Sequence, residues 1–205
     1  LANNLAREFV DKIEKKLYLS ISEKTNNVSF KLEKVLKSFS NLNLSVQHFS
    51  SLTGYGHGDL GRETIDKIFA DVLEAEKAAV RVQFVSGTHA ISSALFGVLR
   101  PGDNFLSITG RPYESLEEVI GLRGLGQGSL IEFGALYDEI SLKSDGNIDF
   151  MALEKALNLP RKLIFIQRSC GYTWRPSLSI EVIKEICYLC HKMQPNCICF
   201  VDNCY

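Results

Sequence analysis

The chain has 205 residues, 45% of them hydrophobic, and a formal net charge of −1 at pH 7. This length suits one sizeable domain, or a domain with an appendage. The balanced charge gives no indication of a nucleic-acid or membrane-surface partner, and no apolar run approaches the roughly 20 residues that cross a bilayer. The six cysteines lie in the last quarter without the pattern of a secreted disulfide framework. We therefore expect a protein that is not secreted, with reduced thiols, in the cytoplasm or an organellar matrix, a plastid included.

Two amphipathic helices are predicted at the N-terminus. Apolar residues recur at helical spacing over residues 1–17 and again over residues 28–39. We expect these helices to form an arm over residues 1–48, which packs either on its own domain or on another subunit. A glycine-rich passage, Thr53–Arg62, follows, and a well-patterned helix comes after it.

The most informative stretch of the first half is an apolar run, Val80–Val85, followed by Ser86-Gly87-Thr88. The run predicts a short buried strand, and apolar residues at helical spacing then begin at Ile91. A helix that starts in this way forms an anion site, because its first N–H groups are unpaired and its dipole adds positive charge. Gly87 lets the backbone approach a phosphate, and Ser86 and Thr88 add hydroxyl donors. The same residues equally suit a simple helix cap, and their spacing does not decide between the two.

Strands and helices alternate over the remainder of the chain. We expect strands at residues 104–108, 163–167 and 198–202, and weaker ones at 131–133 and 140–142. The helices between them are expected to start at about residue 112, at 150 and at 179. This alternation predicts a mostly parallel α/β sheet flanked by helices, with ligands bound at the carboxyl ends of the strands. Four segments are expected to converge there: Ser86–Thr88, Thr109–Tyr113, Gln167–Ser169 and Asp202–Asn203.

Two further motifs have alternative explanations. Gly56-x-Gly58-x-x-Gly61 matches the dinucleotide fingerprint, but it lacks a convincing strand before it and an acidic residue at the end of the next strand. Cys187-x-x-Cys190-His191 matches a haem-attachment pattern, yet both cysteines continue the apolar face of a predicted helix. We therefore interpret these cysteines as core residues and expect neither haem nor a metal site.

Asp202 ends an apolar strand, where a carboxylate is costly unless a cationic or protonated group lies beside it. The protonated nitrogen of a cofactor ring is such a group. A phosphate loop, an aromatic residue such as Tyr113 over the crevice and a strand-end Asp together fit pyridoxal phosphate. In that arrangement the loop binds the phosphate, and Asp202 keeps the ring nitrogen protonated so that the ring withdraws electrons from a substrate.

Five stretches resemble the aluminium-resistance, cystathionine beta-lyase-like family: residues 53–62, 85–90, 99–103, 166–172 and 200–205. This family belongs to the fold-type-I pyridoxal-phosphate enzymes of Cys/Met metabolism, whose large domain is aspartate-aminotransferase-like. The resemblance runs from about Phe49 to the end. It implies that residues 49–205 form the first half of the cofactor-binding large domain.

The resemblance also implies roles for individual residues. Ser86, Gly87 and Thr88 match the loop that takes the cofactor phosphate, Tyr113 the ring-stacking Tyr, and Asp202 the Asp that pairs with the pyridine nitrogen. The catalytic residues expected in this chain are Tyr113 and Asp202. The other expected contacts are Tyr55 and Arg62 to the phosphate of a neighbouring subunit, and Gln167, Arg168, Ser169 and Arg175 to the substrate, with Arg168 or Arg175 on its carboxylate.

In this family the Schiff-base lysine follows the strand-end Asp, whereas this sequence stops three residues beyond Asp202. We therefore expect an inactive fragment of a longer protein. The whole protein is expected to be a homo-oligomeric lyase, a dimer or tetramer. It would catalyse β- or γ-elimination at a C–S bond of an amino acid, as cystathionine beta-lyase or methionine gamma-lyase does. The alternatives are a pyridoxal-phosphate enzyme of another class (transaminase or aldolase-like), a non-catalytic regulator with the same fold, and a nicotinamide-dependent oxidoreductase.

Overall fold

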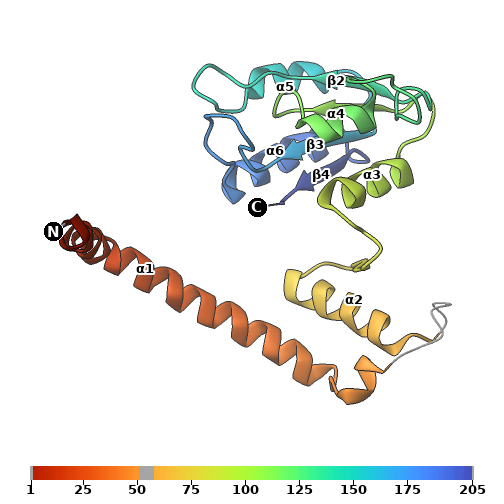
Figure 1. The fold of residues 1–205 in the computed structure, drawn as a ribbon. Coiled ribbons are helices and arrows are strands. Elements are labelled where there is room, and N and C mark those ends of the chain that lie inside the picture. Colours follow the sequence, from red (N-terminus) through yellow and green to blue (C-terminus); the bar gives the residue numbers. More distant parts are fainter. Residues whose placement is uncertain (1, 51–57, 205) are drawn as a thin grey trace. The chain divides into compact units, whose positions relative to one another are not determined.

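The computed structural model describes residues 2–50 and 58–204, which form two compact units, residues 1–83 and 84–205 (Figure 1). The expected helical arm, residues 1–48, falls within the first unit. The expected start of the large domain, Phe49, also lies in the first unit, whereas all the strands belong to the second. None of the described helices is long and apolar enough to cross a membrane.

The first unit contains α1 (Ala2–Asn41), the short 3-10 helix η1 (Val46–Phe49) and α2 (Leu60–Leu73). The two helices predicted over residues 1–17 and 28–39 are one continuous helix, so this prediction was wrong. Residues 18–27 contain neither Gly nor Pro, and the Thr25 hydroxyl donates to the Ile21 carbonyl within the helix at 2.9 Å. Nothing in this stretch breaks a helix, and the Thr25 hydroxyl bonds within the helix rather than competing with it from outside.

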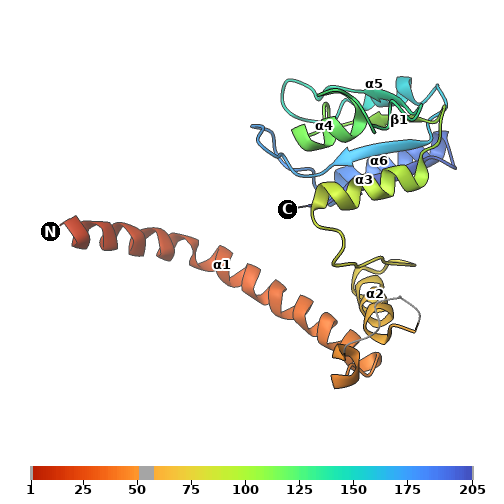
Figure 2. The ribbon, with the colours of Figure 1, turned by 45° about the vertical axis from the view of Figure 1, so that its right-hand side comes forward.

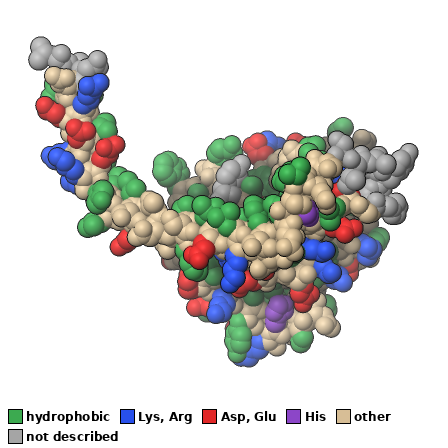
Figure 3. All heavy atoms as spheres, turned by 90° about the horizontal axis from the view of Figure 1, so that it is seen from below, with side chains coloured by type: hydrophobic (Ala, Val, Ile, Leu, Met, Phe, Trp, Pro, Cys, Tyr) green, Lys and Arg blue, Asp and Glu red, His purple; other side chains and the backbone are tan. Residues whose placement is uncertain are grey.

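Much of α1 is exposed to solvent. Apolar side chains lie among acidic and basic ones along its surface (Figure 3). Near its C-terminal end, Lys34 forms an ion pair with Glu74 just after α2, at 2.6 Å. An apolar groove of about 650 Å³ lies between the end of α1, η1 and α2. Its lining includes Val35, Phe39, Ile65, Ile68, Phe69 and Val72.

The strand predicted over Val80–Val85 does not form. Val82 is 89% exposed, and the backbone N–H of Val80 donates to a side-chain oxygen of Asp66 in α2 at 2.7 Å. The Arg81 guanidinium donates to the same oxygen, also at 2.7 Å. A strand needs neighbouring strands for its backbone groups, and here α2 supplies a partner instead. An apolar run predicts burial, but it does not supply a strand to pair with.

The second unit is built on a four-stranded sheet in which every neighbouring pair is parallel. Its strands are β1 (Asn104–Ser107), β2 (Leu136–Glu139), β3 (Leu163–Gln167) and β4 (Ile198–Asp202), in the order β2-β1-β3-β4. The predicted parallel α/β fold is thereby confirmed. The weak strand predicted at 131–133 is a turn, because the N–H groups of Leu130 and Ile131 donate to carbonyls at the end of the preceding helix. The other weak strand, predicted at 140–142, lies four residues earlier, as β2.

Two pairs of helices cover the two faces of this sheet. Helices α3 (Gly87–Val98) and α4 (Glu114–Ile120) cover one face, in front in Figure 2. Helices α5 (Phe150–Ala156) and α6 (Ile180–Met193) cover the other. Each buried Leu, Ile or Phe contributes about 1.5–3 kcal/mol to this packing. All five residues of β3 are buried, as expected for a central parallel strand.

Cysteines contribute to the α6 face as apolar residues. Cys190 is fully buried in the core, and Cys187 packs against the same cluster. Burial raises the pKa of the Cys187 and Cys197 thiols to about 11, so they remain protonated near neutral pH. Among the described residues, no group of His, Cys, Asp or Glu side chains forms a candidate metal site.

A buried arginine just before β3 links β1, β2 and α5. Arg161 is 7% exposed, and its guanidinium donates to the side chains of Asn104 and Asp138 and to the Ala156 carbonyl at 3.1 Å. The hydrogen bond from Arg161 lowers the pKa of Asp138. The site was predicted at the carboxyl ends of the strands. This network therefore braces the opposite edge of the sheet.

Candidate functional site

Helix α3 begins at the predicted phosphate loop. Ser86 is its N-cap, with an extended backbone, and its hydroxyl oxygen accepts a hydrogen bond from the N–H of His89 at 3.0 Å. The helix then continues for 12 residues, enough to develop a dipole with positive charge at this end. Capping and anion binding are compatible, because a cap takes up only one of the unpaired N–H groups.

Three hydroxyl groups meet beside the start of α3. The Thr88 hydroxyl lies 3.3 Å from the Tyr113 hydroxyl and 3.0 Å from that of Ser115. Tyr113 is the N-cap residue of α4, so this contact joins the starts of two helices. Ser115 was not among the predicted site residues, since no local motif marks it. Its only signal in the sequence is its place in the first turn of a helix that begins near the site.

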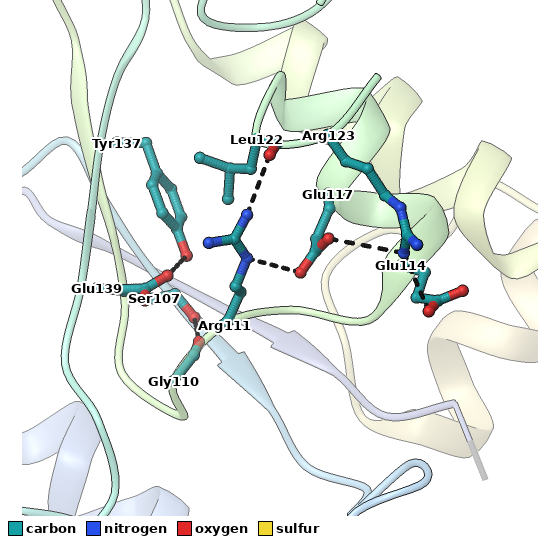
Figure 4. A network of polar contacts seen from close by, with 9 residues as sticks. All are labelled: Ser107, Gly110, Arg111, Glu114, Glu117, Leu122, Arg123, Tyr137 and Glu139. Carbon is teal, nitrogen blue, oxygen red and sulfur yellow. Dashed lines mark hydrogen bonds and ion pairs between the residues drawn. The ribbon is translucent and has the colours of Figure 1, made fainter.

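The loop that leads to Tyr113 is held by a network of polar contacts (Figure 4). Arg111 donates to a Glu117 carboxylate oxygen at 2.7 Å and to the Leu122 carbonyl at 3.0 Å. Ser107, at the end of β1, donates to the Gly110 carbonyl at 2.6 Å. These bonds fasten the loop to both β1 and α4, which limits the positions open to Tyr113.

Gln167 and Asp202 lie side by side at the carboxyl ends of β3 and β4. They are registered partners, as are Phe165 and Phe200 two residues earlier, whose rings stack at 5.7 Å. Because side chains alternate between faces, Gln167 and Asp202 share the face that α3 and α4 cover. They are 8% and 6% exposed. Asp202 accepts a hydrogen bond from the N–H of Cys204 at 3.0 Å, and burial raises its pKa.

The start of α3 lies against the chain that follows Asp202. A Cβ atom on Gly87 would sit 3.4 Å from the Cys204 sulfur. Nearby, the Thr109 hydroxyl oxygen accepts a hydrogen bond from the N–H of Gln167 at 3.2 Å. The four segments expected to converge are thus joined by direct contacts. The sequence analysis included Thr109 in one of those segments but predicted no role for it. Cys204 was not predicted as a site residue.

The two arginines proposed for a substrate carboxylate are bonded to their own chain. Arg175 donates to the carbonyls of Gln167, at 3.0 Å, and of Ser169, and burial lowers its pKa. Arg168 donates to the Leu178 carbonyl at 3.2 Å and to the Asn203 side chain at 2.7 Å. Both side chains therefore brace the loop after β3, and their role toward a substrate stays a prediction.

The remaining predicted residues belong to the first unit. Arg62 lies in α2, where its guanidinium pairs with Asp59 at 3.2 Å. Tyr55 and Gly56 fall outside the described residues. A Cβ on Gly61 would lie 2.6 Å from the His48 carbonyl oxygen, so the third glycine of the G-x-G-x-x-G pattern is required where η1 approaches α2.

The second unit provides groups suited to pyridoxal phosphate. The start of α3 suits its phosphate. Asp202 is buried and, within residues 2–50 and 58–204, has no ion pair with a basic side chain. A buried carboxyl in this condition fits a ligand that brings its own positive charge.

Together, the parallel sheet, the helix start and the strand-end acid define a domain of the fold-type-I class. At the level of the fold alone, the structure is similar to metB from Corynebacterium glutamicum (TM-score 0.51, 15% identity, covering 75% of this chain and 35% of that one). It is also similar to an aspartate aminotransferase from Rhodobacter sphaeroides 2.4.1 (TM-score 0.50, 17% identity, covering 84% and 42%).

The chain belongs to the methionine gamma-lyase family, whose model matches residues 6–205. It is 50% identical over 173 residues to the uncharacterized protein YnbB of Bacillus subtilis (strain 168), covering 84% of this chain and 41% of YnbB. It is also similar to the crystal structure of a "putative cystathionine beta-lyase involved in aluminum resistance" from Listeria innocua. That likeness has a TM-score of 0.94 and 46% identity, and covers 98% of this chain and 49% of that one. The expected resemblance is confirmed, and the chain spans about half the length of these two relatives.

Proposed function

We propose that this chain provides the cofactor-binding part of a pyridoxal-phosphate-dependent lyase that breaks a C–S bond in a sulfur amino acid. The observation that carries the proposal is the place of Asp202. This buried carboxyl ends β4, and its chain passes directly against the start of α3. One ligand with an anion at one end and a protonated nitrogen at the other satisfies both features.

Each part of the site has a task in this proposal. The N–H groups at the start of α3 and the Thr88 hydroxyl bind the phosphate. Tyr113, held by the loop from β1, packs on the ring, and Asp202 holds a proton on the ring nitrogen. When bound, the cofactor supplies an electron-withdrawing ring that makes bonds at the amino-acid α-carbon easier to break. The buried setting of Asp202 excludes water from the pairing and so strengthens it.

The substrate class is supported by the family and by the Listeria innocua relative, whose name is that of a cystathionine beta-lyase. Both names denote elimination at a C–S bond. We further propose a homo-oligomer in which Tyr55 and Arg62 reach the phosphate of a neighbouring subunit. In the same proposal Gln167, Arg168, Ser169 and Arg175 lie near the substrate.

The proposal is tested on the full-length protein with pyridoxal phosphate and, separately, L-cystathionine, L-cysteine and L-methionine. We expect a near-visible absorption band from bound cofactor, together with ammonia, a keto acid and a sulfur-containing product. Transfer of the amino group without release of sulfur would instead assign the protein to another pyridoxal-phosphate class. Bound nicotinamide without the near-visible band would refute the cofactor assignment.

A further inference from the structure

Helix α4, which begins directly after Tyr113, is only seven residues long. A helix of this length has little stability of its own in water, so contacts with the rest of the fold decide where it lies. Two of its side chains, Leu116 and Ile120, are fully buried in the core. Apolar packing is not directional, and it therefore fixes the depth of α4 more firmly than the place of its first residue.

A charged residue in the loop before α4 reaches along the whole helix (Figure 4). The Arg111 guanidinium donates through Nε to a Glu117 carboxylate oxygen at 2.7 Å. Through Nη2 it donates to the carbonyl of Leu122, two residues past the end of α4, at 3.0 Å. The Glu117 side chain is only 14% exposed. Because a guanidinium is planar and rigid, two such bonds restrict direction as well as distance, and they fix how α4 is oriented on its loop.

The ion pair between Arg111 and Glu117 is linked to Tyr113 through the backbone. The N–H of Glu117 donates to the Tyr113 carbonyl at 3.0 Å, and Arg111 lies two residues before Tyr113 in the chain. The Tyr113 hydroxyl in turn lies 3.3 Å from that of Thr88 at the start of α3. The pair therefore holds Tyr113 from both chain directions at the place where the residue meets the candidate site.

We propose that Arg111 and Glu117 are positioning residues whose ion pair sets the place at which Tyr113 packs on the cofactor ring. The inference rests on the proposed function, which assigns Tyr113 to that ring. Without the pair, the loop and the start of α4 are less pre-organised, and binding of the cofactor has to order them at a cost in affinity.

A second arginine beside the same carboxylate provides a matched control. Arg123 lies 3.9 Å from the other oxygen of Glu117, and its closer contact, at 3.0 Å, is with Glu114, whose side chain is 82% exposed. Arg123 follows α4 in the chain, so its contacts do not join the helix to the loop before it. Arg123→Met therefore removes a positive charge beside Glu117 without releasing the loop that carries Tyr113.

The test uses full-length protein and pyridoxal phosphate. The readouts are the dissociation constant from equilibrium dialysis and the circular dichroism of the near-visible cofactor band, which depends on how the ring is held. We expect Arg111→Met and Glu117→Gln each to weaken binding roughly three- to tenfold and to change the dichroism. Arg111→Lys keeps the charge and should recover part of the loss, whereas Arg123→Met should leave both readouts unchanged.

A double-mutant cycle with Tyr113→Leu distinguishes positioning from general support of the fold. Because Arg111 acts through Tyr113, we expect Arg111→Met to have no further effect on affinity once the aromatic ring is removed. Equal losses with and without that ring overturn the inference and leave the proposed function standing, as do unchanged readouts in both Arg111→Met and Glu117→Gln. A wild type that binds no pyridoxal phosphate overturns both proposals. Glu117→Gln is nearly isosteric, so the inference remains falsifiable even where Arg111→Met does not fold.

Discussion

Asp202 has a pKa raised by its burial, which means that its ionised form is disfavoured by the fold without a ligand. In the unfolded chain an aspartate titrates at about 3.9. Between that value and the raised native value, the native state binds more protons than the unfolded state. Stability of the ligand-free protein therefore falls as the pH rises through this window, and above the window the loss remains constant. The residue costs stability in the ligand-free fold and lies at a site where a cation would offset that cost.

We accordingly expect Asp202→Asn to stabilise the ligand-free protein at pH 7, by on the order of 1 kcal/mol, while weakening the binding of pyridoxal phosphate. The gain should shrink as the pH falls toward 4, since the native carboxyl is then protonated and the unfolded one is about half protonated. Urea unfolding of wild type and variant between pH 4 and pH 8 measures this difference. A variant that is less stable than the wild type at every pH would show that Asp202 serves the fold and not a ligand.

At the scale of elements, the start of α3 has two possible roles, as a helix cap and as an anion site. The sequence alone did not decide between them. Ser86→Asp separates them. Asp caps a helix as well as Ser does, and its charge interacts favourably with the dipole by about 0.3–1 kcal/mol. Stability should therefore be kept or slightly raised. A phosphate at the same place would meet a negative charge, so we expect the affinity for pyridoxal phosphate to fall roughly tenfold or more.

The matched control is Ser179→Asp at the start of α6, where Ser179 caps by the same type of bond, to the N–H of Val182 at 3.3 Å. We expect Ser179→Asp to keep or slightly raise the stability, as Ser86→Asp does, and to leave the affinity for pyridoxal phosphate unchanged. Thermal unfolding and cofactor titration of both variants provide the comparison. Equal cofactor affinity in Ser86→Asp and wild type would place the phosphate elsewhere.

Strands and helices were predictable from the sequence where the local apolar pattern and the tertiary environment favour the same structure. The strands at 163–167 and 198–202 were predicted to the residue, because each apolar run is short, bounded by polar residues and supplied with a neighbouring strand. Val80–Val85 was also predicted as a strand from its apolar residues, but it forms none: no strand pairs with it among the described residues, and the N–H of Val80 bonds to Asp66 of α2 instead. The continuity of α1 was missed because the prediction followed apolar residues at helical spacing over residues 1–17 and 28–39 only, whereas the helix also runs through the residues between them.

The site was predictable only in part for a related reason. Strand ends and helix starts can be located in sequence, which pointed to Ser86–Thr88, Tyr113, Gln167 and Asp202. Contacts between side chains from different elements are set by packing, which local pattern does not contain. The bond from Thr88 to Ser115 and the approach of Cys204 to Gly87 therefore appear only in the structure.

At the scale of the whole molecule, each of the two units contains a helical glycine, and their surroundings are opposite. Gly61 in α2 has the His48 carbonyl oxygen where its Cβ would be, at 2.6 Å, whereas Gly97 in α3 has open space. A glycine kept for close packing and a glycine that merely weakens a helix respond to alanine with opposite signs. The pair also tests the origin of the glycine-rich pattern, because a packing role for Gly61 requires no nucleotide.

We expect Gly61→Ala to destabilise the protein by about 1–3 kcal/mol, the cost of forcing an extra carbon into a packed contact. Gly97→Ala should stabilise it by about 0.5–1 kcal/mol, since alanine loses less conformational entropy in a helix. Both are measured by denaturant unfolding followed by circular dichroism, without any ligand. If Gly61→Ala is tolerated as well as Gly97→Ala, the close approach of η1 and α2 does not explain the glycine, and a ligand-binding role for the G-x-G-x-x-G segment regains support.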